Sequence, residues 1–233
     1  MTTRIVLVPG FWLGQWAWEE VVGPLHDDGF DVVALTLPGL DPGQGSGATV
    51  TLADQAAAIE AALDVDADRR VLVVHSGAAF PGTLALDRRP DLVDRLILVD
   101  TAPPMPGLAF NAEQGGDFTL DQAWGGLDEE GSFAGLTEAQ LAEFRERAVP
   151  QPASVVTEPV ALRNEARHRV PLTVICTAFT SEAYQQYAAQ GVPFLAALLD
   201  YDDVTYLDLP TGHWPMWSRP DELATLIGEA ARQ

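Results

Sequence analysis

The segment 71–80 (Val-Leu-Val-Val-His-Ser-Gly-Ala-Ala-Phe) limits the possible folds more than any other part of the chain. Four β-favouring apolar residues lead directly into a His-Ser-Gly turn, and small residues that can begin a helix follow. A strand, a sharp turn with Ser76 at its tip and a helix together indicate a nucleophile elbow, for which the expected pattern is Gly-x-Ser-x-Gly. Ala78 keeps the second small position, but Val74 is bulkier than the glycine expected first. The same residues also fit an ordinary buried strand, so other motifs must support a catalytic serine.

The rest of the chain alternates short apolar runs with amphipathic segments. We expect strands at 5–8, 31–37, 71–74, 96–99, 172–176 and 204–209, and helices at 16–26, 52–63, 82–89 and 221–232. Thr51 and Asp54 have the spacing of a capping box, and residues 40–50, rich in glycine, predict a loop before it. Short apolar strands that alternate with helices are typical of a sheet covered on both faces. The sequence therefore predicts an α/β fold with a doubly wound, mostly parallel sheet.

One segment interrupts this alternation. Residues 102–170 lie between two predicted core strands and are too long for an ordinary crossover. The segment opens with Pro-Pro-Met-Pro, has a glycine-rich polar middle, and includes an amphipathic helical pattern at 136–147. We predict that residues 1–233 form a single domain in which 102–170 is an inserted lid over the strand ends. The alternative is a mobile surface excursion that contacts no ligand.

Charge and composition exclude several classes of function. The net charge is −21, with 34 acidic and 13 basic residues, all of the latter arginine. Such a surface repels nucleic acid and anionic membranes, so neither is an expected partner. Cys176 is the single cysteine, so no disulfide framework or cysteine metal site is expected. No apolar run approaches the ~18 residues of a membrane span, and no secretory leader precedes the first strand. We expect a cytoplasmic protein, and its oligomeric state stays open.

A serine nucleophile needs a base to accept its proton. His213 follows the last predicted strand, and it lies at the same sheet edge as Ser76 because parallel strands all point the same way. The other histidines are less suitable. His26 is at a solvated helix end beside two aspartates, His75 is within the elbow, and His168 lies in an arginine-flanked part of the insertion. His213 is therefore the predicted base.

Three motifs follow one another in a distinctive order. They are Val6-Leu7-Val8-Pro9-Gly10-Phe11 with Trp16 and Trp18, then His75-Ser76-Gly77, then Gly212-His213 with Pro215 and Pro220. In this combination the chain resembles the α/β-hydrolase superfamily over nearly its full length. Within that superfamily it resembles the small esterases grouped with plant methyl esterases and hydroxynitrile lyases.

This resemblance implies a role for each matching residue. Ser76 would attack an acyl carbonyl, and His213 would take its proton and pass it to the leaving group. The backbone N–H groups of Phe11 and Gly77 would form the oxyanion hole. Gly10 would let the first loop approach closely enough to place the Phe11 amide. A proline precedes Gly10 where the family usually has histidine, and we expect the oxyanion hole to survive this change.

The sequence offers two candidates for the acid that supports His213. The family usually places it a few residues after the next-to-last strand, where Phe179 and Thr180 stand here. Glu182 is slightly further along the same loop, and Asp100 ends the strand before the insertion, as in some haloalkane dehalogenases of this fold. We prefer Asp100 because it adjoins the sheet edge directly. Both carboxylates also have structural interpretations, as a cap of a turn and as a first-turn helix residue.

Aromatic residues near these loops suggest an apolar pocket. We predict that Gly10, Trp12, Phe80 and Trp214 line an acyl site, with ordinary core packing as the alternative for the aromatic members. No metal or organic cofactor is implied, and the expected partner is a small-molecule substrate.

The resemblance favours a serine esterase or lactonase acting on a small, largely apolar ester. Hydroxynitrile lyases of the group use a pocket lysine and a threonine where Gly10 stands, and this chain has no lysine. Epoxide hydrolases and dehalogenases need an aspartate in place of Ser76. A perhydrolase or acyltransferase would use the same residues. The alternative from another class is a ligand-binding or catalytically impaired protein of this fold, motivated by Val74, by Pro9 and by the absence of an acid at the family's usual position.

Overall fold

The computed structural model describes residues 2–42 and 50–233 of the chain. Within them lies one sheet of six parallel strands in the order β2-β1-β3-β4-β5-β6. The strands are β1 (Thr3–Val8), β2 (Asp31–Ala34), β3 (Arg69–His75), β4 (Arg95–Val99), β5 (Leu172–Cys176) and β6 (Val204–Asp208). The α-helices are α1 (Glu19–Asp27), α2 (Leu52–Leu63), α3 (Ala79–Arg88), α4 (Leu120–Glu129), α5 (Glu138–Arg147), α6 (Ala153–Thr157), α7 (Ser181–Ala189), α8 (Pro215–Ser218) and α9 (Pro220–Ala231).

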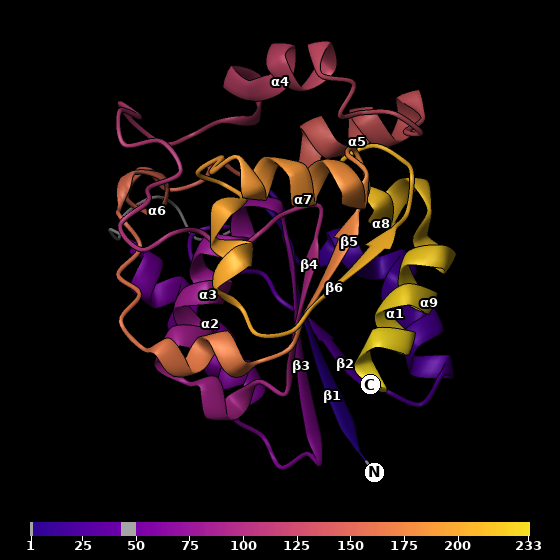
Figure 1. Cartoon of the computed structure of the whole chain (residues 1–233). Coiled ribbons are helices and arrows are strands. Elements are labelled where there is room, and N and C mark those ends of the chain that lie inside the picture. Colours follow the sequence, from indigo (N-terminus) through magenta and orange to yellow (C-terminus); the bar gives the residue numbers. More distant parts are fainter. Residues whose placement is uncertain (1, 43–49) are drawn as a thin grey trace.

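Helices cover both faces of the sheet, as Figure 1 shows. Helices α2 and α3 pack together on one face, and α1 and α9 pack together on the other. Each layer buries its own apolar core against alternate residues of the strands, and the β4 strand is buried along its whole length. The predicted doubly wound parallel α/β fold is confirmed. In the described ranges, no helix is both long and apolar enough to span a bilayer.

Several element boundaries differ from the predicted ones. Strand β2 ends at Ala34 because the chain then turns away, with Thr36 accepting a hydrogen bond from the Gln15 N–H. The first helix begins at Glu19, after a 3-10 turn at Gln15–Trp18. The predicted capping box at α2 is present, since Thr51 and Asp54 exchange hydrogen bonds. Residues 43–49 of the expected loop at 40–50 lie outside the described residues.

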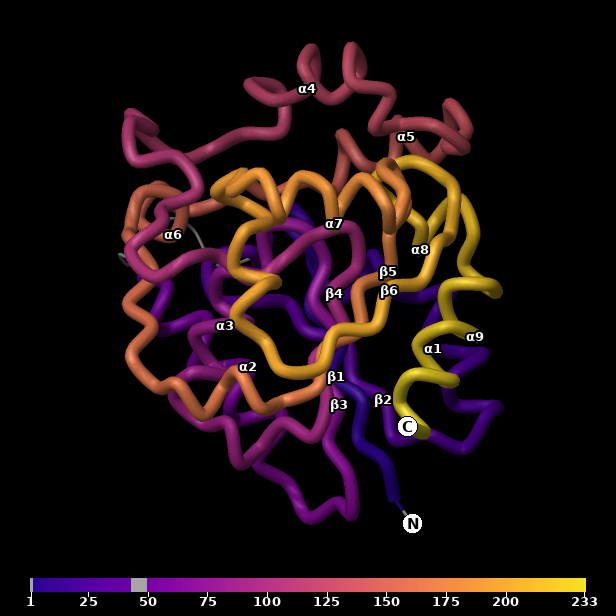
Figure 2. The backbone as a smooth tube through the Cα atoms, in the orientation of Figure 1, coloured from indigo at the N-terminus to yellow at the C-terminus, as the bar shows by residue number. Residues whose placement is uncertain are grey.

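The segment 102–170 places α4 and α5 above the edge where the strands end, and after α6 it runs down past α3 to the start of β5 (Figure 2). It contains α4, α5 and α6, and an antiparallel bridge between Phe118 and Gln151 closes it on itself. Its backbone also holds the loop before α8, because the carbonyl of Ser132 accepts a hydrogen bond from the His213 N–H at 2.7 Å. This backbone hydrogen bond therefore attaches the insertion to His213 at the carboxyl edge of the sheet.

The structure explains how the bulky Val74 fits beneath the elbow. A Cβ on Gly82 would lie 2.5 Å from a methyl carbon of Val74. Helix α3 thus approaches the strand at a residue without a side chain, and the valine methyl occupies the space. Gly82 on the facing helix thus supplies the space that a glycine at position 74 would otherwise have left.

Candidate active site

Ser76 lies at the tip of a sharp turn between β3 and α3. Its backbone has a φ of 53°, in the left-handed region that residues other than glycine rarely adopt. Among the described residues, the other non-glycine residues with positive φ are Trp12 at 68° and Asp100 at 47°. All three follow the carboxyl ends of the central strands β1, β3 and β4. Strained backbone of this kind concentrates at functional sites, so this edge is the candidate site.

His213 is held in place through its own backbone. Its N–H donates to the Ser132 carbonyl at 2.7 Å, and its carbonyl accepts a hydrogen bond from Nε2 of His75, also at 2.7 Å. The preceding Gly212 lies so close to the insertion that a Cβ there would be 2.5 Å from the carbonyl oxygens of Ser132 and Ala134. These contacts fix the backbone of the loop, so that the imidazole projects from it in one direction.

A chain of hydrogen bonds joins three of the predicted residues. Nε2 of His213 lies 2.8 Å from Oγ of Ser76, and Nδ1 lies 2.6 Å from Oδ2 of Asp100. The structure therefore brings Asp100, the preferred acid, to the histidine. Glu182 instead lies exposed in the first turn of α7 and takes no part in these hydrogen bonds. The role of Asp100 in a reaction stays a prediction.

Asp100 is buried, with 8% of its surface exposed, and it is well supplied with donors. Burial raises its pKa, but the hydrogen bond from His213 and that from the Thr177 N–H outweigh it, and the pKa lies below its ordinary value. A carboxylate at this position is therefore ionised at neutral pH. It can hold the imidazole with Nδ1 protonated and Nε2 free to accept the serine proton.

The first loop lies against the elbow from the other side. A Cβ on Gly10 would be 2.9 Å from the Cβ of Ser76, so only glycine fits here without displacing the serine. The ring of Phe11 in turn covers Gly77, where any side chain would overlap it. Both predicted oxyanion donors, the Phe11 and Gly77 amides, thus belong to backbone segments packed around Ser76. Within the described residues, the Phe11 N–H makes no hydrogen bond.

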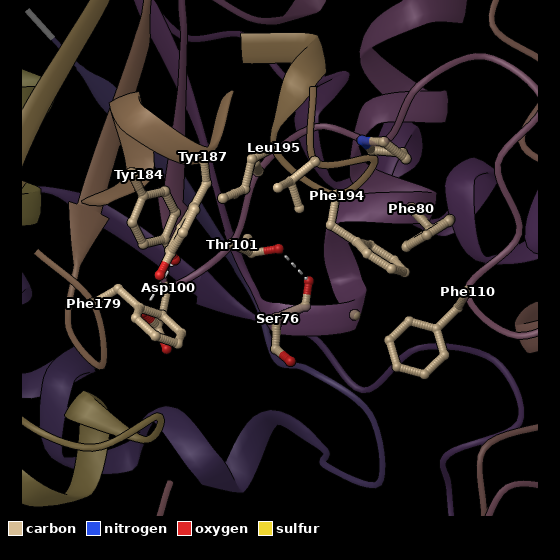
Figure 3. Close-up of a pocket in the computed structure, with 14 residues that line it drawn as sticks. Ser76, Phe80, Asp100, Thr101, Phe110, Phe179, Tyr184, Tyr187, Phe194 and Leu195 are labelled. Carbon is tan, nitrogen blue, oxygen red and sulfur yellow. Dashed lines mark hydrogen bonds between the residues drawn. The ribbon is translucent and has the colours of Figure 1, made fainter. Parts of the chain in front are cut away.

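An apolar cavity of about 460 Å³ opens beside Ser76. Figure 3 shows aromatic side chains around it, with Ser76 at its floor and Thr101 bonded to the Ser76 carbonyl at 3.0 Å. The lining residues are Ser76, Gly77, Phe80, Asp100, Thr101, Ala102, Pro104, Phe110, Phe179, Tyr184, Tyr187, Val192, Phe194 and Leu195. Asp100 carries the one carboxyl group among them, and they include no basic residue.

The cavity corrects part of the predicted pocket. Phe80 lines it, as expected, but Gly10, Trp12 and Trp214 do not. The indole of Trp12 is buried and donates to the Phe118 carbonyl at 2.8 Å. Trp214 is 2% exposed because its ring stacks between neighbouring aromatic rings behind the site. These indoles pack the insertion against the sheet, and Gly10 contacts the elbow instead.

Sequence reasoning missed most of the cavity wall. Six of its residues, from Phe179 to Leu195, come from the segment around α7, and not from the insertion that was expected to cover the site. A signal was present, since Tyr184 and Tyr187 are spaced to share one helix face. The segment 178–199 also carries a single charged residue, Glu182, in a chain that is 20% charged. Such a stretch beside a site is a candidate wall for an apolar ligand.

His75 supports the site and makes folding depend on pH. Burial, and then the neighbouring His213, lower its pKa from 6.5 to about 3. Between these values the unfolded chain binds a proton that the folded protein does not, so the free energy of unfolding falls as the pH is lowered. We expect a loss of about 1 kcal/mol attributable to His75 between pH 7.5 and 5.5.

Urea unfolding at both pH values measures this effect. The His75→Gln variant, whose amide can still donate to the His213 carbonyl, should lose this part of the pH dependence. The same substitution at the exposed His26 on α1, His26→Gln, is the matched control for replacing a histidine by glutamine. Equal pH dependence in His75→Gln and in the wild type would contradict the assignment.

A parallel sheet with a serine, a histidine and an aspartate joined at its carboxyl edge defines a known class of α/β proteins. The model of the alpha/beta hydrolase family matches residues 5–226. The chain therefore belongs to the alpha/beta hydrolase family, and the resemblance seen in the sequence is confirmed. A search of curated proteins found no match. In the described residues, no cluster of three metal-ligating side chains occurs.

Solved structures share the fold over the whole chain. A methylesterase from Arabidopsis has a TM-score of 0.75 at 18% identity, over 99% of each chain. A pyrethroid hydrolase from Sphingobium faniae has a TM-score of 0.72 at 19% identity, over 100% of this chain and 98% of the other. An extracellular α/β-hydrolase from a Paenibacillus species has a TM-score of 0.72 at 19% identity, over 99% of both chains. The cytoplasmic location expected here stays a prediction.

Proposed function

We propose that the protein is a serine hydrolase that cleaves small, neutral, largely apolar carboxylic esters or lactones. The observation that carries this proposal is the hydrogen-bonded chain from Ser76 through His213 to Asp100, at the floor of an apolar cavity. Oγ of Ser76 attacks the acyl carbon while its proton passes to Nε2 of His213. The amides of Phe11 and Gly77 bind the oxyanion that forms.

The second half of the reaction restores the enzyme. When the bond from the acyl carbon to the leaving oxygen breaks, His213 gives its proton to that oxygen, and an ester of Ser76 remains. A water molecule then attacks this acyl-enzyme, loses a proton to His213, and releases the carboxylic acid as Ser76 takes the proton back. Asp100 holds the imidazole in one tautomer and stabilises its positive charge throughout.

The walls of the cavity suggest which substrates are accepted. Its lining offers aromatic and aliphatic contacts and no arginine, and Asp100 at its base repels anions. Burying an unpaired carboxylate in such surroundings is costly. We propose that the insertion 102–170, which contributes Ala102, Pro104 and Phe110 to this wall, acts as a lid within a single domain.

A pair of esters matched in length tests the proposed specificity. We expect kcat/KM for 4-nitrophenyl butyrate to exceed that for the 4-nitrophenyl monoester of succinic acid by at least about 10-fold, since the latter carries a carboxylate into the cavity. Release of 4-nitrophenol at pH 7.5 measures both. Equal rates, or a preference for the anion, would contradict the neutral apolar site. A wider panel of acyl esters and lactones would then define the preferred acyl group.

A further inference from the structure

Asp100 stands in an unfavourable backbone conformation and needs anchoring. Its φ of 47° aims the carboxylate toward His213, and such strain persists only where the surroundings fix it. Oδ2 accepts the hydrogen bond from His213 at 2.6 Å. Oδ1 accepts three more, from the N–H groups of Thr177 and Ala178 at 3.2 Å each and from the hydroxyl of Tyr184 at 3.1 Å. Oδ2 therefore contacts the histidine, while Oδ1 anchors the carboxylate to the loop after β5 and to α7.

Tyr184 differs from the other two donors because it is a side chain that also borders the cavity. It lies on α7 with 4% of its surface exposed, and its ring forms part of the cavity wall. Figure 3 shows this ring next to Asp100 at one end of the cavity. The helix is fixed at its start, where the Ser181 N–H and hydroxyl both donate to Asp208. Tyr184 is thus held between the substrate space and the carboxylate.

The Tyr184 phenol is neutral at neutral pH and can therefore donate a hydrogen bond. Burial, and then the adjacent Asp100 charge, raise the pKa of Tyr184 well above its ordinary value. Because an ionised carboxylate can only accept, the neutral Tyr184 hydroxyl is the donor in this hydrogen bond. A bond to a charged acceptor in a buried site is among the stronger ones in proteins.

We propose that Tyr184 is a positioning residue for the reaction, and that its hydroxyl fixes Oδ1 of Asp100 so that Oδ2 meets Nδ1 of His213. This inference rests on the proposed function. It assigns to Tyr184 a role in turnover exerted through Asp100, beyond its place in the cavity wall. Loss of the hydroxyl frees the carboxylate to rotate, so the imidazole spends less time in the productive orientation.

A double-mutant cycle on kcat and KM for 4-nitrophenyl butyrate tests this role. We expect Tyr184→Phe to lower kcat by about 10-fold and to change KM by less than about 2-fold, since the ring and its apolar contacts stay. In the Asp100→Asn background the same substitution should change kcat by less than about 2-fold, because an asparagine cannot accept the Nδ1 proton of His213, and fixing its side chain then no longer orients the imidazole. Tyr201→Phe, which removes the hydroxyl of a buried tyrosine outside the cavity lining, is the matched control. Thermal unfolding midpoints verify that every variant is folded.

Two results would overturn the inference. One is an equal loss of kcat in both backgrounds, which would mean that Tyr184 acts only as part of the wall. The other is an unchanged kcat in Tyr184→Phe. Failure of the proposed function is recognised separately, because the wild type would then hydrolyse no ester, or Ser76→Ala would retain the activity whatever Tyr184 does.

Discussion

Replacing Ser76 with alanine is expected to lower kcat for 4-nitrophenyl butyrate by at least about 10⁵-fold. The hydroxyl is the atom that His213 reaches at 2.8 Å, and alanine leaves no group that can form the acyl-enzyme. The elbow itself should persist, because the loss of one oxygen does not change the contacts that hold the turn. Residual hydrolysis would come from the oxyanion donors and from binding alone.

Serine-to-alanine substitution elsewhere supplies the control for this result. Ser154 on α6 has its hydroxyl bonded to the backbone of Val50 and lies outside the cavity lining. We expect Ser154→Ala to keep kcat within about 2-fold of the wild type. Measured turnover of Ser76→Ala within 10-fold of the wild type would remove Ser76 from the mechanism.

The second large effect is expected for Asp100→Asn, at about 10³- to 10⁴-fold in kcat. The three donors around Oδ1 require an acceptor there, so the asparagine carbonyl oxygen takes that place. Its amide NH₂ must then face Nδ1 of His213 and donate to it. The imidazole is driven into the tautomer that carries its proton on Nε2, which cannot accept the proton of Ser76. The loss therefore follows from a wrong tautomer in an intact site.

Glu182→Gln is the matched control, because it makes the same chemical change at the other candidate acid. We expect its kcat to remain near that of the wild type, since Glu182 lies exposed at the start of α7. Steady-state kinetics of both variants at pH 7.5 make the comparison. A large loss in Glu182→Gln together with a small loss in Asp100→Asn would reverse the assignment of the acid.

Much of the fold follows from local sequence patterns. The apolar runs of β3 and β4 are fully buried strands, and the capping box at Thr51 begins α2 as expected. The positions of Ser76 and His213 at one edge follow from strand direction alone. Boundaries were less accurate where tertiary contacts decide them, as at β2, which ends early on the edge of the sheet.

The choice of acid and the cavity wall required the structure. Asp100 and Glu182 both follow strands that end at the same edge, and in the structure it is Asp100, with its positive φ, whose carboxylate lies 2.6 Å from His213. Large aromatic residues occur both in pockets and in cores, so the sequence could not show that Phe80 lines the cavity while Trp12 and Trp214 pack in the core. Their places depend on how the insertion packs, which is set by contacts distant in the sequence.

Covalent labelling tests most directly whether Ser76 is an activated nucleophile. In the reaction with a neutral alkyl fluorophosphonate, a bond forms from Oγ of Ser76 to phosphorus, fluoride leaves, and the serine proton passes to His213. Intact-mass spectrometry of the wild type is expected to show one adduct per chain, localised to Ser76 and formed in step with the loss of esterase activity. Ser76→Ala is expected to show no adduct. An unmodified wild-type mass, or equal labelling of Ser76→Ala, would contradict the account and favour a ligand-binding protein of this fold.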